Sequence, residues 1–175
     1  MTLSETIVKI AKSYVGEKEI KGNMGFKNPE FLAKMKSTGW ELTQPWCSYF
    51  GELVWKEAFT ESGLPIATID KLFSASALST YYNFASSNLF KVGITPKRGA
   101  LVIWKHGVDP KRHEGHEGII TEYNFNGIFF NSVEGNTSGD NPNEREGEIV
   151  AEKAHSLRTP PSFKGLNLIG FVYPE

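Results

Sequence analysis

The arrangement of apolar residues changes character once along this chain, after about residue 90. Upstream, apolar residues recur every three or four positions, which is the period of a helix that packs one face on a core. Downstream, they gather in short runs rich in Ile, Val and Phe, which are typical of strands. Helices followed by strands predict an α+β fold with an antiparallel sheet of about five to six strands. The 175-residue chain is expected to form one domain, residues 1–175, with a helical part at about 1–90 and a sheet part at about 96–175.

Local start and stop signals place the individual elements. Thr2 and Glu5 fit a capping box, and Asn28 followed by Pro29 fits the cap and the first residue of a second helix. The segments with helical spacing are 2–14, 28–39, 47–61 and 71–88, the last of them weakly patterned. The segments with strand composition are 101–104, 117–121, 127–133, 148–151 and 168–173, with a hairpin turn at 124–127. The order of elements supports the α+β class.

The single cysteine, Cys47, is expected to open the third helix, because a proline and a turn precede it and apolar residues at helical spacing follow it. In the first turn the thiol faces unpaired backbone N–H groups and the positive end of the helix dipole. Both favour the thiolate and lower the pKa of a cysteine below its usual value of about 8.5. A thiolate is a nucleophile, so the position suggests catalysis. A buried structural cysteine fits the same segment equally well.

A cysteine nucleophile needs a base, and His116 is the best candidate among the four histidines. It stands where the polar loop 105–115 enters a predicted strand, so its side chain would be held firmly near solvent. For His106 and His155 we expect solvated side chains without a function.

The group that orients the base should come from the neighbouring strand, which ends in Glu134 and Asn136. These two side chains share a face if the chain stays extended. A bend at Gly135 would let only one of them reach the imidazole. The segment 134–140 also has the composition of an ordinary turn.

Other chemistries are poorly supported. The spacing of His113 and His116 is one residue short of the helical H-E-x-x-H pattern, and Gly115 argues against a helix there, so we expect no metal and no cofactor. A Walker-type or G-x-G-x-x-G glycine loop is missing from the sequence. The formal charge of −1 and a pI near 6.4 give no electrostatic case for nucleic acid. An apolar stretch of the about 20 residues that a membrane span needs is also missing.

Four runs, in this order along the chain, resemble the CHAP amidases and peptidases, within the wider NlpC/P60-like, papain-like group of cysteine peptidases: PWCSYFGELVWKEA, PKRGALVIWK, GHEGIITE and VEGNTSGD. The likeness extends from about Tyr14 to the C-terminus and implies a papain-like fold with the nucleophile helix packed on an antiparallel sheet. Two residues depart from the family pattern. Ala100 stands where Asp is usual, and Glu117 stands where a small or branched apolar residue is typical, which suggests a more open or differently charged cleft edge.

The resemblance implies roles for the candidate residues. Cys47 would be the nucleophile and His116 the general base. Glu134 would orient the base, with Asn136 as an alternative or a polar helper. The family's usual substrate is bacterial peptidoglycan, cleaved at the amide between N-acetylmuramic acid and L-alanine or within the peptide stem or cross-bridge.

Trp46, Gln44 and Trp40 are candidate substrate contacts, because they precede or adjoin Cys47, whereas we expect Trp55 and Trp104 to pack in the core. The loop between residues 17 and 27 is not acidic, so the calcium that some family members bind is not expected.

The N-terminus lacks a basic region followed by an apolar run, so we expect synthesis in the cytoplasm without a signal peptide and action on the cell wall after release or delivery. A monomer is expected, as a phage lysis enzyme with a holin partner or a toxin with an immunity protein. The alternatives are a wall-binding module without activity and a cysteine hydrolase for another amide.

Overall fold

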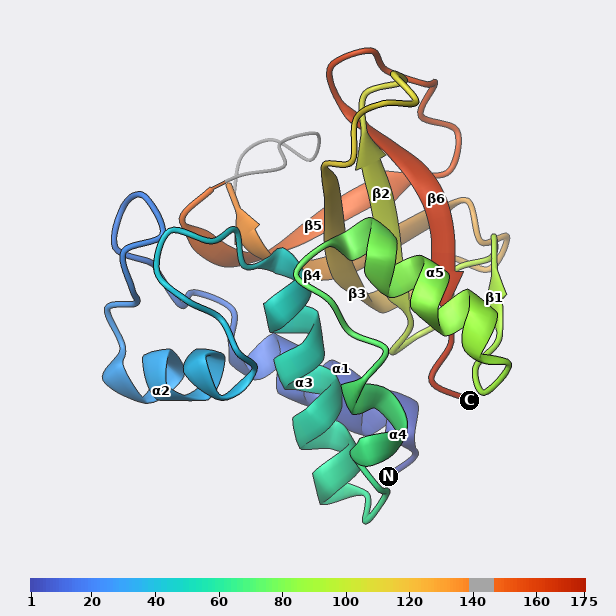
Figure 1. Ribbon diagram of the computed structural model, residues 1–175. Coiled ribbons are helices and arrows are strands. Elements are labelled where there is room, and N and C mark those ends of the chain that lie inside the picture. The colour runs from blue at the N-terminus through green and yellow to red at the C-terminus, as the bar shows by residue number, and fades with distance from the viewer. Residues whose placement is uncertain (139–146) are drawn as a thin grey trace.

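The computed structural model describes residues 1–138 and 147–175. In these residues the fold is α+β, with five helices and one six-stranded sheet whose pairings are all antiparallel, as the sequence predicts (Figure 1). The helices are α1 (Leu3–Ser13), α2 (Pro29–Ser37), α3 (Cys47–Glu61), α4 (Ala67–Asp70) and α5 (Ala77–Ser87). The strands are β1 (Val92–Gly93), β2 (Leu101–His106), β3 (Gly115–Tyr123), β4 (Phe129–Thr137), β5 (Ile149–Ser156) and β6 (Leu166–Val172), in the order β1-β6-β2-β3-β4-β5. Gly139 and Asp140, the last two residues of the run VEGNTSGD, lie outside the described residues.

The first two helices begin at the predicted capping residues. Thr2 accepts a hydrogen bond from the Glu5 N–H at 3.2 Å, and the Glu5 carboxylate accepts one from the Thr2 N–H at 2.8 Å. The side chain of Asn28 accepts from the first N–H groups of α2. A side-chain cap of this kind stabilises a helix by about 1 kcal/mol.

Helices gather on one side of the curved sheet, and α3 lies against β3 and β4 (Figure 1). On this side Leu101, Ile119 and Val133 pack with apolar residues of α1 and α3. Alternate strand residues form a second apolar cluster on the other side: Ala100, Val102, Trp104, Ile120, Phe130, Leu166, Phe171 and Tyr173. Because β3 and β4 are covered on both faces, polar side chains on them are shielded from water.

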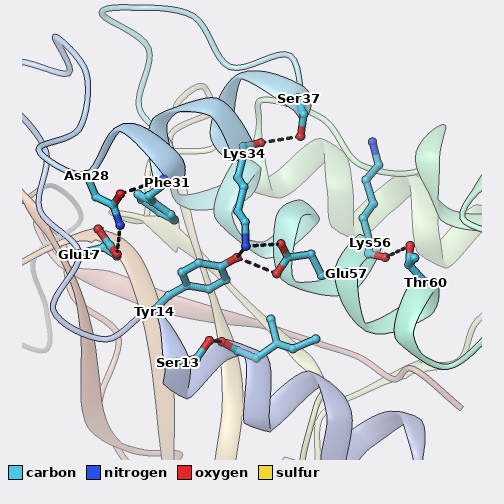
Figure 2. Close-up of polar contacts among 11 residues, drawn as sticks. Ser13, Tyr14, Glu17, Asn28, Phe31, Lys34, Ser37, Lys56, Glu57 and Thr60 are labelled. Carbon is cyan, nitrogen blue, oxygen red and sulfur yellow. Dashed lines mark hydrogen bonds and ion pairs between the residues drawn. The ribbon is translucent and has the colours of Figure 1, made fainter.

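A polar cluster joins the end of α1 to α2 and α3 (Figure 2). Tyr14, the residue after α1, donates to Glu57 of α3 at 2.7 Å and accepts from Lys34 of α2 at 2.8 Å. Lys34 also lies 3.0 Å from Glu57. Burial is the main cause that raises the pKa of Tyr14 to about 12, so the phenol remains a neutral donor.

Three predicted boundaries are wrong. The segment 71–88 is not one helix, because the Ser76 side chain caps α5 and Thr80 binds both backbone groups of Ser74, which holds the preceding turn. β4 continues through Glu134 to Thr137, where we noted turn composition, and β5 extends to Ser156. Both extensions depend on pairing between β4 and β5, which no local pattern encodes.

Candidate active site

Cys47 is the first residue of α3 and is 6 % exposed. Trp46, the residue before it, places no side-chain cap on the helix, and the first turn carries no acidic residue. The N–H groups of a first helical turn point out of the helix end, and the helix dipole favours a negative charge there. The predicted start of this helix at Cys47 is confirmed.

His116 is the second residue of β3, and its side chain is fully buried. Its Nε2 lies 2.9 Å from Oε2 of Glu134. Burial alone would lower the pKa of His116, but the nearby Cys47 and the hydrogen bond with Glu134 outweigh it and raise the pKa to about 9. Since Nε2 is engaged by the carboxylate, we assign Nδ1 as the nitrogen that faces the thiol. At neutral pH the ring is then an imidazolium between a sulfur and a carboxylate.

Glu134 of β4 is fully buried and holds two histidines rather than one. Its Oε1 accepts from Nε2 of His155 at 2.6 Å and from the Ser132 hydroxyl at 2.6 Å, and Lys153 lies 3.9 Å from Oε2. Burial alone would raise the pKa of Glu134, but the two histidines hold it well below its usual range. The carboxylate therefore stays charged and fixed.

The expectation that His155 is a solvated side chain is wrong. It lies opposite Phe130 in the β4–β5 pairing, its ring stacks on Phe130 and lies tilted against Trp104, and it binds Glu134. Strand alternation from Lys153 to His155 was the available signal, but it has meaning only once β5 is known to extend that far.

Asn136 does not stay on the face of Glu134. Its φ is 55°, a left-handed conformation, and the β4–β5 register shifts between Glu134 and Thr137. The bend anticipated at Gly135 thus occurs one residue later. Glu134 is the residue that accepts the hydrogen bond of His116, and Asn136 is buried two residues further along β4.

A cleft of about 500 Å³ opens at Cys47. Its walls come from Pro45 before α3, from Ala75–Ala77 at the start of α5, and from Lys111–Gly115 in the β2–β3 connection. On this last wall Arg112 pairs with Glu114 at 3.2 Å. Sequence reasoning missed both outer walls, since neither segment carries a motif. His116, buried, does not line the cleft, so a ligand would meet the sulfur first.

The aromatic residues near Cys47 do not reach this cleft. Trp46 is fully buried, packs edge-on against Phe26 and Phe50, and donates its indole N–H to the Glu19 carboxylate. Trp40 is 2 % exposed and donates to the backbone oxygen of Gln44 at 2.9 Å. The expected substrate contacts of both tryptophans are therefore wrong, because the loop before α3 folds their rings inward.

Gln44 is half-buried, and its side-chain oxygen accepts from the Tyr49 hydroxyl at 2.9 Å and from the Glu41 N–H at 3.2 Å. It holds the turn that leads into α3, and it is not among the residues lining the cleft. Trp55 and Trp104, as expected, are buried in the core.

Glu117, next to His116, is not at an open cleft edge as we expected. Its side chain is fully buried between β3 and α3, where Oε2 lies 2.9 Å from Ser48 Oγ. Burial and the nearby Cys47 raise the pKa of Glu117 well above its usual value. Two buried carboxyl groups thus flank the site, one charged and one neutral.

In residues 1–138 and 147–175, no three His, Cys, Asp or Glu side chains gather closely enough to hold a metal ion. Over the same ranges no helix is long and apolar enough to cross a membrane. Comparison of the chain with protein-family models, with curated proteins and with solved structures gave no match in any of the three.

Proposed function

We propose that this protein is a cysteine hydrolase with a papain-like arrangement that cleaves amide bonds of bacterial peptidoglycan. The observation that carries the proposal is the buried series Cys47, His116 and Glu134, with the cysteine at the uncapped start of a helix and at the floor of a cleft. A thiol, an imidazole near it and a carboxylate that holds the imidazole are the parts that thiol-dependent acyl transfer requires.

The first half of the reaction would form an acyl-enzyme. The Cys47 thiolate attacks the amide carbonyl carbon, and the carbonyl oxygen becomes an oxyanion at the positive end of the α3 dipole. The tetrahedral intermediate then expels the amine, which takes a proton from the His116 imidazolium. Glu134 fixes the ring throughout, because its carboxylate keeps Nε2 in place.

The second half would restore the enzyme. Water attacks the thioester carbonyl while His116, now neutral, accepts a proton from the water through the nitrogen that faces the thiol. Collapse of this intermediate releases the carboxylic acid and returns the Cys47 thiolate beside the imidazolium. Each cycle consumes one water and one amide, and it releases one acid and one amine.

Peptidoglycan as the substrate rests on the sequence resemblance and on the open cleft. The cleft reaches the sulfur between the β2–β3 connection and the start of α5, so an extended chain could lie across it. A module that only bound the cell wall would have no use for a buried imidazolium and carboxylate beside a cysteine. A cysteine hydrolase for another amide would use the same residues and differ only in the cleft walls.

The test is digestion of purified peptidoglycans of several cross-link types by the wild-type protein and by Cys47→Ala. Mass spectrometry should find soluble fragments with the wild type alone, and their masses would identify the bond. Equal fragments from a folded Cys47→Ala protein would contradict the mechanism. If every peptidoglycan remains intact, peptidoglycan is the wrong substrate.

A further inference from the structure

The buried carboxyl group of Glu117 has no part in the mechanism above, yet it lies directly behind the nucleophile. Its Oε1 is buried without a hydrogen-bond partner, and in the part of the chain that the structure describes no cation pairs with the side chain. A buried polar atom without a partner destabilises a fold by about 1–3 kcal/mol. Such a group calls for an explanation.

Helix α3, which packs against Glu117, leaves space for the carboxyl group because it carries a glycine at the contact. Gly51 lies in α3 one turn after Cys47, and a Cβ atom at this position would collide with Oε1 of Glu117. A glycine within a helix is itself less favourable than alanine by about 1 kcal/mol. Glu117 and Gly51, each of which costs the fold free energy on its own, are thus in contact one helical turn after Cys47.

A chain of short contacts runs from Glu117 across the start of α3 to the wall of the cleft. Glu117 Oε2 lies 2.9 Å from Ser48 Oγ, Ser48 Oγ lies 3.1 Å from Thr80 Oγ1, and Thr80 Oγ1 lies 3.2 Å from the backbone oxygen of Ser74. The Ser74 N–H also donates to Thr80 Oγ1, at 3.0 Å. This series of hydrogen-bonded side chains therefore links β3, α3 and α5 to the segment that leads into Ala75–Ala77 of the cleft.

Counting hydrogen atoms along this chain assigns the state of Glu117. The three oxygen–oxygen contacts need one hydrogen each, whereas the hydroxyls of Ser48 and Thr80 supply one each and the Ser74 carbonyl supplies none. All three bonds form together only if the Glu117 carboxyl group is protonated and donates to Ser48. Ser48 can then donate to Thr80, and Thr80 to Ser74.

We propose that Glu117 is a positioning residue, an uncharged carboxylic acid whose hydrogen-bond chain through Ser48 and Thr80 holds the first turn of α3 at the place where Cys47 meets His116. The proposal rests on the function proposed above, since it concerns the same cysteine. The charged or titratable groups that face Glu117 are Cys47 and Glu52, both on α3, and both oppose its ionisation. Conversely, a charged Glu117 would disfavour the Cys47 thiolate.

The test compares Glu117→Gln with Glu117→Leu. The amide of glutamine is neutral and can donate to Ser48 as the acid does, whereas leucine fills the space without a donor. Ser48→Ala breaks the chain at its second member with little change in volume. Thr121→Val, which replaces a buried hydroxyl at the other end of β3, is the matched control.

The primary measurement is the rate at which iodoacetamide alkylates Cys47 as a function of pH, which needs no substrate. We expect the apparent pKa of the thiol to be unchanged in Glu117→Gln and Thr121→Val. In Glu117→Leu and Ser48→Ala it should rise toward the free value, so that alkylation below pH 7 slows by about tenfold for each unit. If Glu117→Leu does not fold, the thiol pKa of Ser48→Ala alone tests the inference.

Two results would overturn the inference. One is a lower thiol pKa in Glu117→Gln, which would mean that Glu117 is charged in the wild type. The other is unchanged alkylation in both Glu117→Leu and Ser48→Ala. Failure of every protein to digest peptidoglycan would contradict the proposed substrate but leave this comparison intact. Where digestion occurs, we expect kcat to fall roughly 10- to 100-fold in Glu117→Leu, the size of effect that a misplaced reacting group produces.

Discussion

His155 and His116 bind different oxygens of the Glu134 carboxylate. Nε2 of His155 lies 2.6 Å from Oε1, and Nε2 of His116 lies 2.9 Å from Oε2. The ring of His155 is fixed in turn, because it lies against Trp104 and Phe130. It also lines a second cavity, of about 590 Å³, whose other walls include Leu157 and Leu166. This cavity is larger than the cleft at Cys47, but the only thiol of the sequence lies in the cleft, so we assign the chemistry to the cleft.

Replacement of His155 should therefore weaken catalysis indirectly, through its hydrogen bond to Glu134. His155→Phe leaves Oε1 with one donor fewer, and we expect kcat to fall about tenfold with little change in KM, in keeping with the loss of a hydrogen bond to a charged group. His155→Gln, whose amide can donate from a similar position, should recover much of the loss. His106→Gln, a half-buried histidine on β2, serves as the control. Full activity in His155→Phe would show that the second histidine is only structural.

The charge of Glu134 should set the alkaline limit of activity. The pKa of His116 is raised to about 9, so the imidazolium beside Cys47 persists up to that pH. Glu134→Gln removes the negative charge and should move the alkaline limb of the kcat/KM profile down by a unit or more, with kcat reduced roughly 10²- to 10⁴-fold. A profile with the same alkaline limb in both proteins would mean that another group controls it.

Stability should depend on pH through the same histidine. Its pKa is about 9 in the folded protein against the usual histidine value of 6.5, so folding is favoured by its protonation. This contribution is fully present below about pH 6.5 and is lost as the pH rises through 9. The urea midpoint of the wild type should fall across this interval, and that of His116→Gln should fall less. Parallel slopes for the two proteins would contradict the raised pKa.

Trp46 offers a test of the corrected role for the tryptophans. Because its ring is buried and its N–H donates to Glu19, Trp46→Phe should lower the free energy of unfolding by about 1–3 kcal/mol while KM stays unchanged. Urea denaturation and steady-state kinetics measure the two effects separately. A raised KM with unchanged stability would restore the substrate contact that the sequence suggested.

Much of the helical layer could be predicted because its signals are local. The capping box of Thr2 and Glu5, the Asn28–Pro29 start and the apolar spacing after Cys47 each depend on a few neighbouring residues. Cys47, His116 and Glu134 could be named from motif order, although the bend that separates Asn136 from Glu134 could only be stated as an option.

The missed features depend on contacts between distant segments. His155 gains its partner from the β4–β5 register, and the burial of Glu117 depends on a glycine in α3 that leaves room for its carboxyl group. Trp46 adjoins Cys47 in sequence, but its ring packs on Phe26 from a loop twenty residues earlier in the chain. Adjacency in sequence therefore did not predict adjacency to the cleft.

The most direct test of the central claim is titration of the sole cysteine with iodoacetamide while peptidoglycan digestion is followed in the same sample. We expect residual activity to fall in one-to-one proportion to the fraction of Cys47 alkylated, as intact mass measures it, with circular dichroism unchanged. A protein that is fully alkylated at Cys47, still folded and still releasing peptidoglycan fragments would contradict the account.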